Sequence, residues 1–255
     1  MLKGLGRFLI TAVVSFVVIA GALVLNNHSI VSVDYSIADE VSEVISSAVH
    51  VRNLDAGCQG SGVLVGADGL VLTAHHVVDG GDRFEVTLND KRTFKCSRAI
   101  ISRAHDVAFL KLEVDEQLPF AELRCMDGLR VGDVAFLIGS PYGAENFNSV
   151  TMGIISALQR EVNDEEVNRF GWTRLVQTDT PSNSGNSGGP LFAMDGKVVG
   201  VLVGGVPYSD GVSYCVKVEE FVADLDQIRL LFGLDRYRVG AVESELRPGN
   251  LYVGP

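Results

Sequence analysis

The chain has 255 residues, which is enough for one large domain or two small ones. Hydrophobic residues make up 47% of it, so an ample core can form, and its 28 glycines suit an all-β protein with many turns. The formal net charge of -11 argues against a nucleic-acid partner, because phosphates would be repelled.

The first 30 residues contain an uncharged apolar run at 8–25, with Lys3 and Arg7 before it. At ~1.5 Å per residue this run nearly spans a bilayer core of ~30 Å. Under the positive-inside rule the N-terminus stays in the cytoplasm and the rest of the chain is exported. Ala20-Gly21-Ala22 offers an alternative reading as a signal-peptidase site. Because the apolar run continues past it, we expect residues 1–30 to be an uncleaved membrane anchor. Its run at 8–25 would cross the bilayer once as a helix, with the remainder of the chain periplasmic or extracellular.

Residues 31–44 are expected to form a linker above the membrane and the start of a short helix. Apolar side chains recur at helical spacing over 38–48, with acidic residues in the first turn. We interpret this helix as an amphipathic cap on the domain that follows.

Short apolar runs separated by turn signals predict a series of strands. Two Asp-Gly turns, at 66–69 and 194–197, mark hairpins. The expected strands are 49–52, 63–65, 70–73, 84–88, 93–101, 107–112, 131–138, 150–158, 174–178 and 198–203. This spacing favours a sandwich or a barrel over a parallel α/β fold, and composition does not choose between the two. Apolar residues at helical spacing then predict an amphipathic helix over 218–232.

The four cysteines are Cys58, Cys96, Cys125 and Cys215. Export permits disulfides, and four cysteines allow three pairings. Buried free thiols are at least as consistent with the sequence, so we assign no bridge. No pair has the Cys-x-x-Cys spacing, so we expect no metal site and no cofactor.

Ser187 lies in a glycine-rich loop, residues 185–190 with the sequence Gly-Asn-Ser-Gly-Gly-Pro. Glycines let the backbone fold tightly around one side chain, as acyl transfer requires. A surface loop would look the same unless a base and an orienting carboxylate exist upstream. Residues 72–78 supply histidine at the end of an apolar strand, and residues 105–112 supply aspartate at the start of another.

The order histidine, aspartate, serine resembles the chymotrypsin-like serine peptidases, and in particular their HtrA/Deg (trypsin-2-like) branch. Five motifs of that branch occur in order, covering about residues 45 to 230. They are Gly-Ser-Gly-Val at 60–63, Thr-Ala-His-His-Val-Val at 73–78, Asp-Val-Ala-Phe-Leu-Lys at 106–111, Gly-Ser-Pro-Tyr-Gly at 139–143, and the serine loop at 185–190.

The resemblance implies an all-β fold of two perpendicular six-stranded antiparallel β-barrels, closed by a C-terminal helix. We place a trypsin-like serine protease domain at 45–233, with barrels at about 45–118 and 126–217. Relatives often carry a PDZ domain after this point. The tail at 234–255 is too short for one, so we expect none in this chain.

The same resemblance assigns a catalytic triad of His76, Asp106 and Ser187. His76 would act as the base, Asp106 would orient it, and Ser187 would be the nucleophile. We expect His75 to face away from the site, because adjacent residues on extended backbone point to opposite sides. His105 is expected to be solvated.

The oxyanion hole is expected at Gly185, Asn186 and Ser187. Zymogen-activated relatives have aspartate at the position of Asn186, where it pairs with a new N-terminal amine. Asparagine cannot form that ion pair, so the resemblance implies activity without removal of a propeptide.

The resemblance also predicts where substrate binds. The residues expected to bind the substrate backbone as an added strand are Val203, Gly204 and Gly205. Pro181 and Ser182 would lie near the base of the specificity pocket, and Gly211 on its wall. No acidic residue occupies that base, so a buried lysine or arginine would lack a partner. We therefore expect small or medium aliphatic residues at the cleavage site, and we interpret the acidic stretch at 161–166 as a solvated turn.

Three functions are consistent with these residues. The first is a serine endopeptidase that cleaves exported or misfolded polypeptides through an acyl-enzyme. The second is a signalling protease that clips one membrane partner, and the third is a binding or chaperone module with an inactive site. The complete triad favours an enzyme. Trimers are common in the HtrA/Deg branch, so a homotrimer is allowed, although no trimer signature is visible in the sequence.

Overall fold

The computed structural model describes residues 36–102, 104–162, 172–206, 209–233 and 251–253. The expected membrane anchor and most of the tail lie outside these residues, as does most of the acidic stretch at 161–166. Within the described part of the chain, no helix is long and apolar enough to cross a bilayer.

A short helix precedes the sheets, as the sequence predicts. It consists of α2 (Ala38–Val44) and a 3-10 turn, η1 (Ile45–Ser47). Asp39 and Glu40 lie in its first turn, where carboxylates interact favourably with the helix dipole. The helix ends before Ala48, because β1 begins there.

The first sheet is antiparallel and has the strand order β14-β6-β7-β3-β2-β1-β4-β5. Its strands are β1 (Ala48–Asn53), β2 (Gln59–Gly66), β3 (Leu70–Thr73), β4 (Phe84–Thr87), β5 (Thr93–Cys96), β6 (Ala99–Ser102), β7 (Ala108–Lys111) and β14 (Leu251–Val253). The predicted Asp-Gly turn at 66–69 joins β2 to β3.

The prediction of a closed six-stranded barrel was wrong for this half of the fold. The single strand expected at 93–101 is interrupted at Ser97 and Arg98, which are exposed and leave the ladder. The interruption produces two strands, β5 and β6, that lie near opposite ends of an open sheet. The end beside β6 is extended by β14, which pairs with it in antiparallel register.

The second half of the fold is a closed barrel of six strands in the order β10-β13-β12-β11-β8-β9, which confirms the predicted strand number. Its strands are β8 (Val134–Gly139), β9 (Ser149–Arg160), β10 (Leu175–Thr178), β11 (Pro190–Ala193), β12 (Val198–Gly205) and β13 (Ser213–Lys217). The sequence did not predict β11 or β13.

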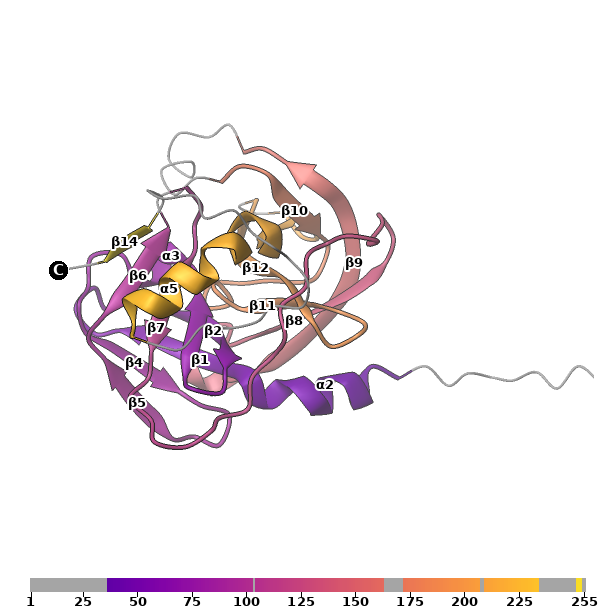
Figure 1. Cartoon of the computed structure of the whole chain (residues 1–255). Coiled ribbons are helices and arrows are strands. Elements are labelled where there is room, and N and C mark those ends of the chain that lie inside the picture. The colour runs from indigo at the N-terminus through magenta and orange to yellow at the C-terminus, as the bar shows by residue number, and fades with distance from the viewer. Residues whose placement is uncertain (1–35, 103, 163–171, 207–208, 234–250, 254–255) are drawn as a thin grey trace, which may run out of the picture. The chain divides into compact units, whose positions relative to one another are not determined.

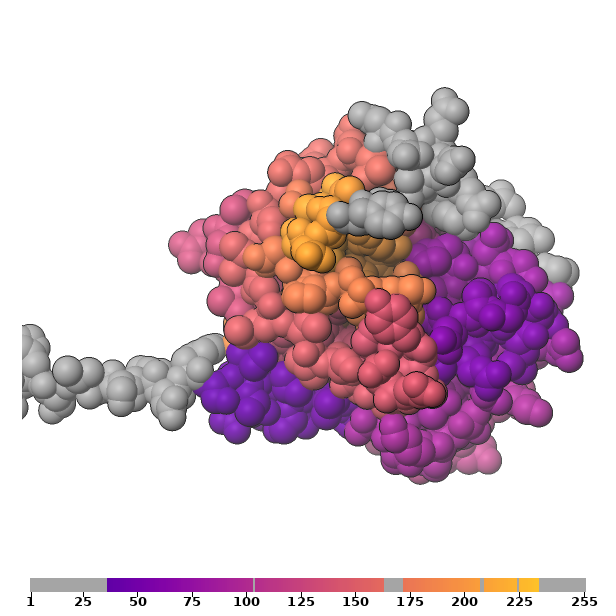
Figure 2. Space-filling model, turned by 180° about the vertical axis from the view of Figure 1, so that it is seen from behind, coloured from indigo at the N-terminus to yellow at the C-terminus, as the bar shows by residue number. Residues whose placement is uncertain are grey.

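One large apolar cluster joins the two sheets. It contains Phe109 from β7 together with Phe136 and Phe192 from the second barrel, all fully buried. The rings of Phe136 and Phe192 stack with centroids 5.0 Å apart. The two sheets occupy separate regions of the ribbon, and their violet and salmon residues gather on opposite sides of the space-filling view (Figures 1 and 2). Residues at the junction are thus held by packing from both sheets.

The C-terminal helix is shorter than predicted. In place of one helix over 218–232 there are two 3-10 turns, η3 (Val218–Glu220) and η4 (Val222–Asp224), followed by α5 (Leu225–Leu231). Phe221 interrupts the helix with φ of -133°, outside the helical region. The helix α5 lies in front of the first sheet (Figure 1) and is fixed there by buried Ile228 and an ion pair between Arg229 and Asp68.

Candidate active site

Asp106 and His76 are paired at the end of the first sheet. Asp106 comes just before β7 and is fully buried. Its Oδ2 lies 2.7 Å from Nδ1 of His76, and its Oδ1 accepts the backbone N–H of His76 at 2.9 Å. The carboxylate therefore fixes both the ring and the backbone of the same histidine. A buried aspartate needs such partners, because its desolvation is otherwise unfavourable.

The two adjacent histidines lie on a helical turn, α3 (His75–Val78), and not on extended backbone. The argument from extended backbone, by which we expected His75 to face away, was therefore wrong. His76, which the family resemblance assigned, is the histidine that contacts Asp106. Val77 and Val78, the last two residues of this turn, are buried and anchor it to the core.

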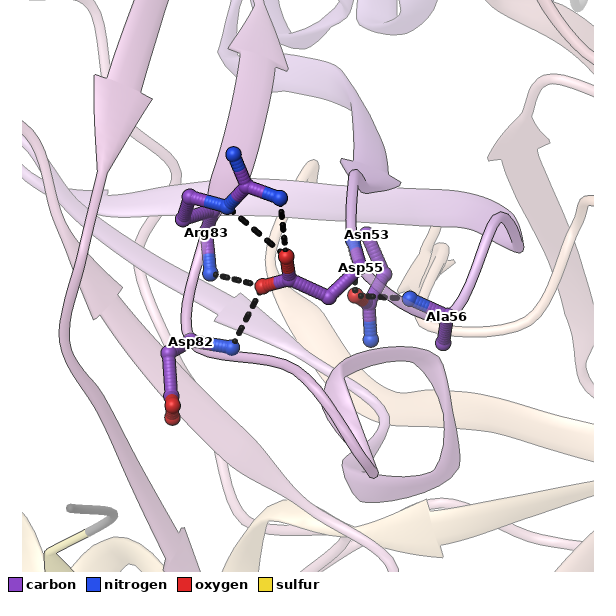
Figure 3. Close-up of polar contacts among 5 residues, drawn as sticks. All are labelled: Asn53, Asp55, Ala56, Asp82 and Arg83. Carbon is purple, nitrogen blue, oxygen red and sulfur yellow. Dashed lines mark hydrogen bonds and ion pairs between the residues drawn. The ribbon is translucent and has the colours of Figure 1, made fainter.

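The β1–β2 connection anchors the far end of α3. The buried Asn53 amide donates to the carbonyls of Val77 and Asp79, at 3.3 and 3.0 Å. The Asp55 carboxylate accepts the backbone N–H groups of Asp82 and Arg83 in the loop that follows (Figure 3). These contacts hold the segment that carries His76, and the sequence analysis did not identify them.

The loop that carries Ser187 contacts β2 and the residues before α3 through its backbone. The Ser187 carbonyl accepts the N–H of Ser61 at 2.7 Å. A Cβ placed on Gly188 would lie 2.3 Å from Oγ1 of Thr73 and 2.9 Å from the backbone N of Ala74. The serine loop therefore packs against the two residues that lead into α3. Within the described part of the chain, the Ser187 hydroxyl forms no hydrogen bond.

The loop leaves two N–H groups available for an oxyanion. Gly185 has φ of +98°, a conformation that favours glycine. Among the described residues, neither Gly185 nor Ser187 donates its backbone N–H to a partner. The N–H of Asn186 instead bonds to the carbonyl of Asn183 at 3.0 Å, so it is not available as the third donor that we expected.

A cavity of about 550 Å³ opens beside Ser187. Of the six predicted substrate-binding residues, five line it, namely Pro181, Ser182, Gly204, Gly205 and Gly211. Val203 is buried next to it.

Hydroxyl groups lie along one wall of this cavity. Ser182 and Ser213 bond to each other at 2.7 Å, and Ser213 also donates to the carbonyl of Thr180 at 2.9 Å. The exposed Asp210 lines the cavity as well. The expectation concerned only the base of the specificity pocket, where no acidic residue was placed.

His105 is not solvated, contrary to expectation. Its side chain is 12% exposed and lies 3.6 Å from the carboxylate of Glu220, which also contacts Arg174 at 3.2 Å. Burial, and then the nearby Arg174 charge, lower the pKa of His105 below its ordinary value. The ring is therefore favoured in its neutral form.

All four cysteines, for which the sequence left the disulfide status open, are free thiols. In the described part of the chain, no group of three or more histidine, cysteine or acidic side chains is arranged to hold a metal ion.

Residues 60–201 match the family model of the trypsin-like peptidase domain. The chain belongs to this family. This trypsin-like peptidase domain is 38% identical over 173 residues to a probable periplasmic serine endoprotease, DegP-like, of Marinomonas sp. (strain MWYL1), with 67% of this chain and 35% of that protein covered. It is 33% identical over 201 residues to serine protease HTRA1 of Xenopus laevis, with 74% of this chain and 42% of that protein covered.

Solved structures support the same assignment. The HtrA-type protease AlgW with tripeptide matches the trypsin-like peptidase domain with a TM-score of 0.67 and 29% identity, over 78% of this chain and 65% of that chain. These likenesses confirm the resemblance to the HtrA/Deg branch. The chain spans roughly a third to two fifths of the length of the curated relatives it matches.

Proposed function

We propose that the chain is a serine endopeptidase, with Ser187 as nucleophile, His76 as general base and Asp106 as the residue that orients His76. The observation that carries this proposal is the buried Asp106 bonded to Nδ1 of His76, on a helical turn against which the Ser187 loop packs. With its proton on Nδ1, the ring has its lone pair on Nε2, the atom that would accept the serine proton.

In this mechanism His76 takes the Ser187 proton as the hydroxyl attacks the carbonyl carbon of the scissile peptide bond. Asp106 stabilises the imidazolium that forms, and the N–H groups of Gly185 and Ser187 donate to the developing oxyanion. His76 then gives its proton to the leaving amine, which leaves an acyl-enzyme on Ser187. Water activated by the same histidine hydrolyses this ester.

The substrates we propose are exported or misfolded polypeptides, bound with a small or medium aliphatic side chain in the cavity beside Ser187. An extended substrate would pair with the β12 edge at 203–205. One relative is named a probable periplasmic serine endoprotease, which supports an exported protease domain. Residues 8–25 would anchor it to the membrane with the N-terminus in the cytoplasm, and a homotrimer remains part of the proposal.

The decisive experiment uses the full chain in detergent and a fluorophosphonate probe. We expect a covalent adduct on Ser187, found by mass spectrometry, that disappears in Ser187→Ala. We also expect His76→Ala to abolish casein hydrolysis and His75→Ala to retain it. Labelling that survives Ser187→Ala would reject Ser187 as the nucleophile. Loss of activity in His75→Ala alone would reassign the base.

Two alternatives predict different results from the same preparation. A protein without adduct that still binds unfolded casein would be a binding or chaperone module. A protein that forms the adduct but does not degrade casein would fit a signalling protease with one membrane partner.

A further inference from the structure

The carboxylate of Asp106 has a third partner that no motif of the sequence indicates. The indole Nε1–H of Trp172 donates to Oδ2 of Asp106 at 2.8 Å, and both residues are buried. This is the same oxygen that lies 2.7 Å from Nδ1 of His76. Trp172 lies just before β10, 66 residues further along the chain than Asp106. The contact therefore joins the second barrel to the paired residues of the first sheet.

The surrounding fold makes room for this indole. A Cβ placed on Gly204 would lie 2.4 Å from Cη2 of Trp172, closer than real Cβ contacts allow. A glycine at this position of β12 therefore leaves room for the outer end of the indole ring. The backbone carbonyl of Trp172 also accepts the N–H of Val162 at 3.3 Å, which ties the residue to the end of β9.

An indole N–H is a donor only, so the direction of this hydrogen bond is fixed by chemistry. Oδ2 accepts from two ring N–H groups, and Oδ1 accepts a backbone N–H. Because three donors surround it, the buried carboxylate is held in one orientation about its Cβ–Cγ bond. In this orientation Oδ2 faces Nδ1 of His76, which favours the tautomer with its proton on Nδ1 and its lone pair on Nε2.

We propose that Trp172 is a positioning residue for catalysis: its indole N–H fixes Asp106, and through Asp106 it sets the orientation and tautomer of His76. The inference rests on the proposed peptidase function. Gly204 has a supporting role, because its missing side chain leaves the space that the indole occupies. Trp172 is not among the described residues that line the substrate cavity, so it acts on the chemical step and not on substrate binding.

The first test replaces only the N–H. Trp172→Phe keeps an aromatic ring and removes the donor, and we expect kcat for a fluorogenic peptide to fall about 10- to 100-fold, as for the loss of a hydrogen bond to a charged group. KM should stay within about twofold. Phe136→Leu is the matched control, since it shortens another buried aromatic in the second barrel without touching Asp106. It should unfold at lower urea concentration and keep kcat.

The second test does not depend on activity. Trp172 is the single tryptophan of the chain, so the full-length protein in detergent micelles should give one indole cross-peak in a ¹H–¹⁵N spectrum. We expect this peak to lie downfield, to exchange slowly with solvent, and to move in Asp106→Asn and in Gly204→Ala. It should not move in Phe136→Leu.

The outcomes separate this inference from the proposed function. An indole peak that does not respond to Asp106→Asn would overturn the inference, whether or not the protein is a peptidase. Unchanged kcat in a folded Trp172→Phe variant, beside an active wild type, would also overturn it. A wild type that forms no adduct at Ser187 would reject the proposed function, while a responsive indole peak would still establish the Trp172–Asp106 bond.

Discussion

Asp106→Asn is the substitution whose result follows most directly from the geometry of the site. In the wild type, Oδ2 faces Nδ1 of His76 at 2.7 Å and the indole N–H of Trp172 at 2.8 Å. Oδ1 accepts the backbone N–H of His76 at 2.9 Å. An asparagine amide replaces one of these acceptors by an NH₂ donor, so the side chain must adopt one of two orientations.

Each orientation leaves one buried donor facing another donor, which costs about 1–3 kcal/mol of folding stability. If the NH₂ group takes the Oδ1 position, it meets a backbone N–H that α3 holds in place. If it takes the Oδ2 position, it meets the indole of Trp172, a side chain that can shift aside. The second orientation should therefore dominate. It forces Nδ1 of His76 to become an acceptor, so the proton moves to Nε2 and the base is lost.

We expect kcat to fall by a factor on the order of 10⁴, or ~5.4 kcal/mol of transition-state stabilisation. The assays are hydrolysis of a fluorogenic peptide, the rate of fluorophosphonate labelling at Ser187, and urea unfolding of the full chain. Asp195→Asn, an exposed carboxylate in an ion pair with Arg124, is the control and should change none of them. A variant that keeps more than a tenth of wild-type kcat would contradict the reasoning.

Three further predictions concern residues that support the fold. Asn53→Ala removes two hydrogen bonds that the amide donates to carbonyls of α3 and the residue after it, and two that its Oδ1 accepts from backbone N–H groups. The free energy of unfolding should fall by about 3 kcal/mol in urea titrations. Mass spectrometry after alkylation at pH 8 should find the exposed Cys58 modified in the native protein. Cys96 and Cys215 should react only after unfolding. They are buried, and burial raises the pKa of Cys96 to about 12 and that of Cys215 further. Burial, partly offset by the Gln59 hydrogen bond, lowers the pKa of His50 below 6.5 in the folded protein. As the pH falls below about 6.5, the unfolded chain therefore binds a proton at His50 before the folded protein does, and the free energy of unfolding should fall. His50→Gln should show a smaller loss of stability between pH 7.5 and 5.5.

Local patterns in the sequence predicted the parts of the fold that depend on local chemistry. Apolar runs bounded by Asp-Gly turns located the β2–β3 hairpin and the start of β12. Two of the strands that were missed, β11 and β13, are short and carry polar or glycine-rich neighbours. Each pairs on one edge with β12, its neighbour in the chain, and on the other edge with a strand distant in the chain, β8 for β11 and β10 for β13. Pairing of this kind leaves little trace in a local pattern.

In the candidate site, too, local motifs could be predicted from the sequence and contacts between distant segments could not. The motifs around His76, Asp106 and Ser187 are local, and the segments that carry them lie next to one another in the fold. His76 was chosen over His75 from the family motif, and the additional argument from extended backbone was wrong, because the chain makes a helical turn there. The contact from Trp172 could not be predicted, because a lone tryptophan in a sequence is most simply explained as a core residue.

The strand β14 has a consequence for the behaviour of the protein in solution. By pairing with β6, it occupies backbone N–H and C=O groups that an uncovered edge would offer to another molecule. Clipping the chain ahead of Leu251 would uncover the edge along Ile100 and Ile101, two β-branched apolar residues. Such a clipped protein should associate edge to edge and scatter light at concentrations where the intact chain stays clear.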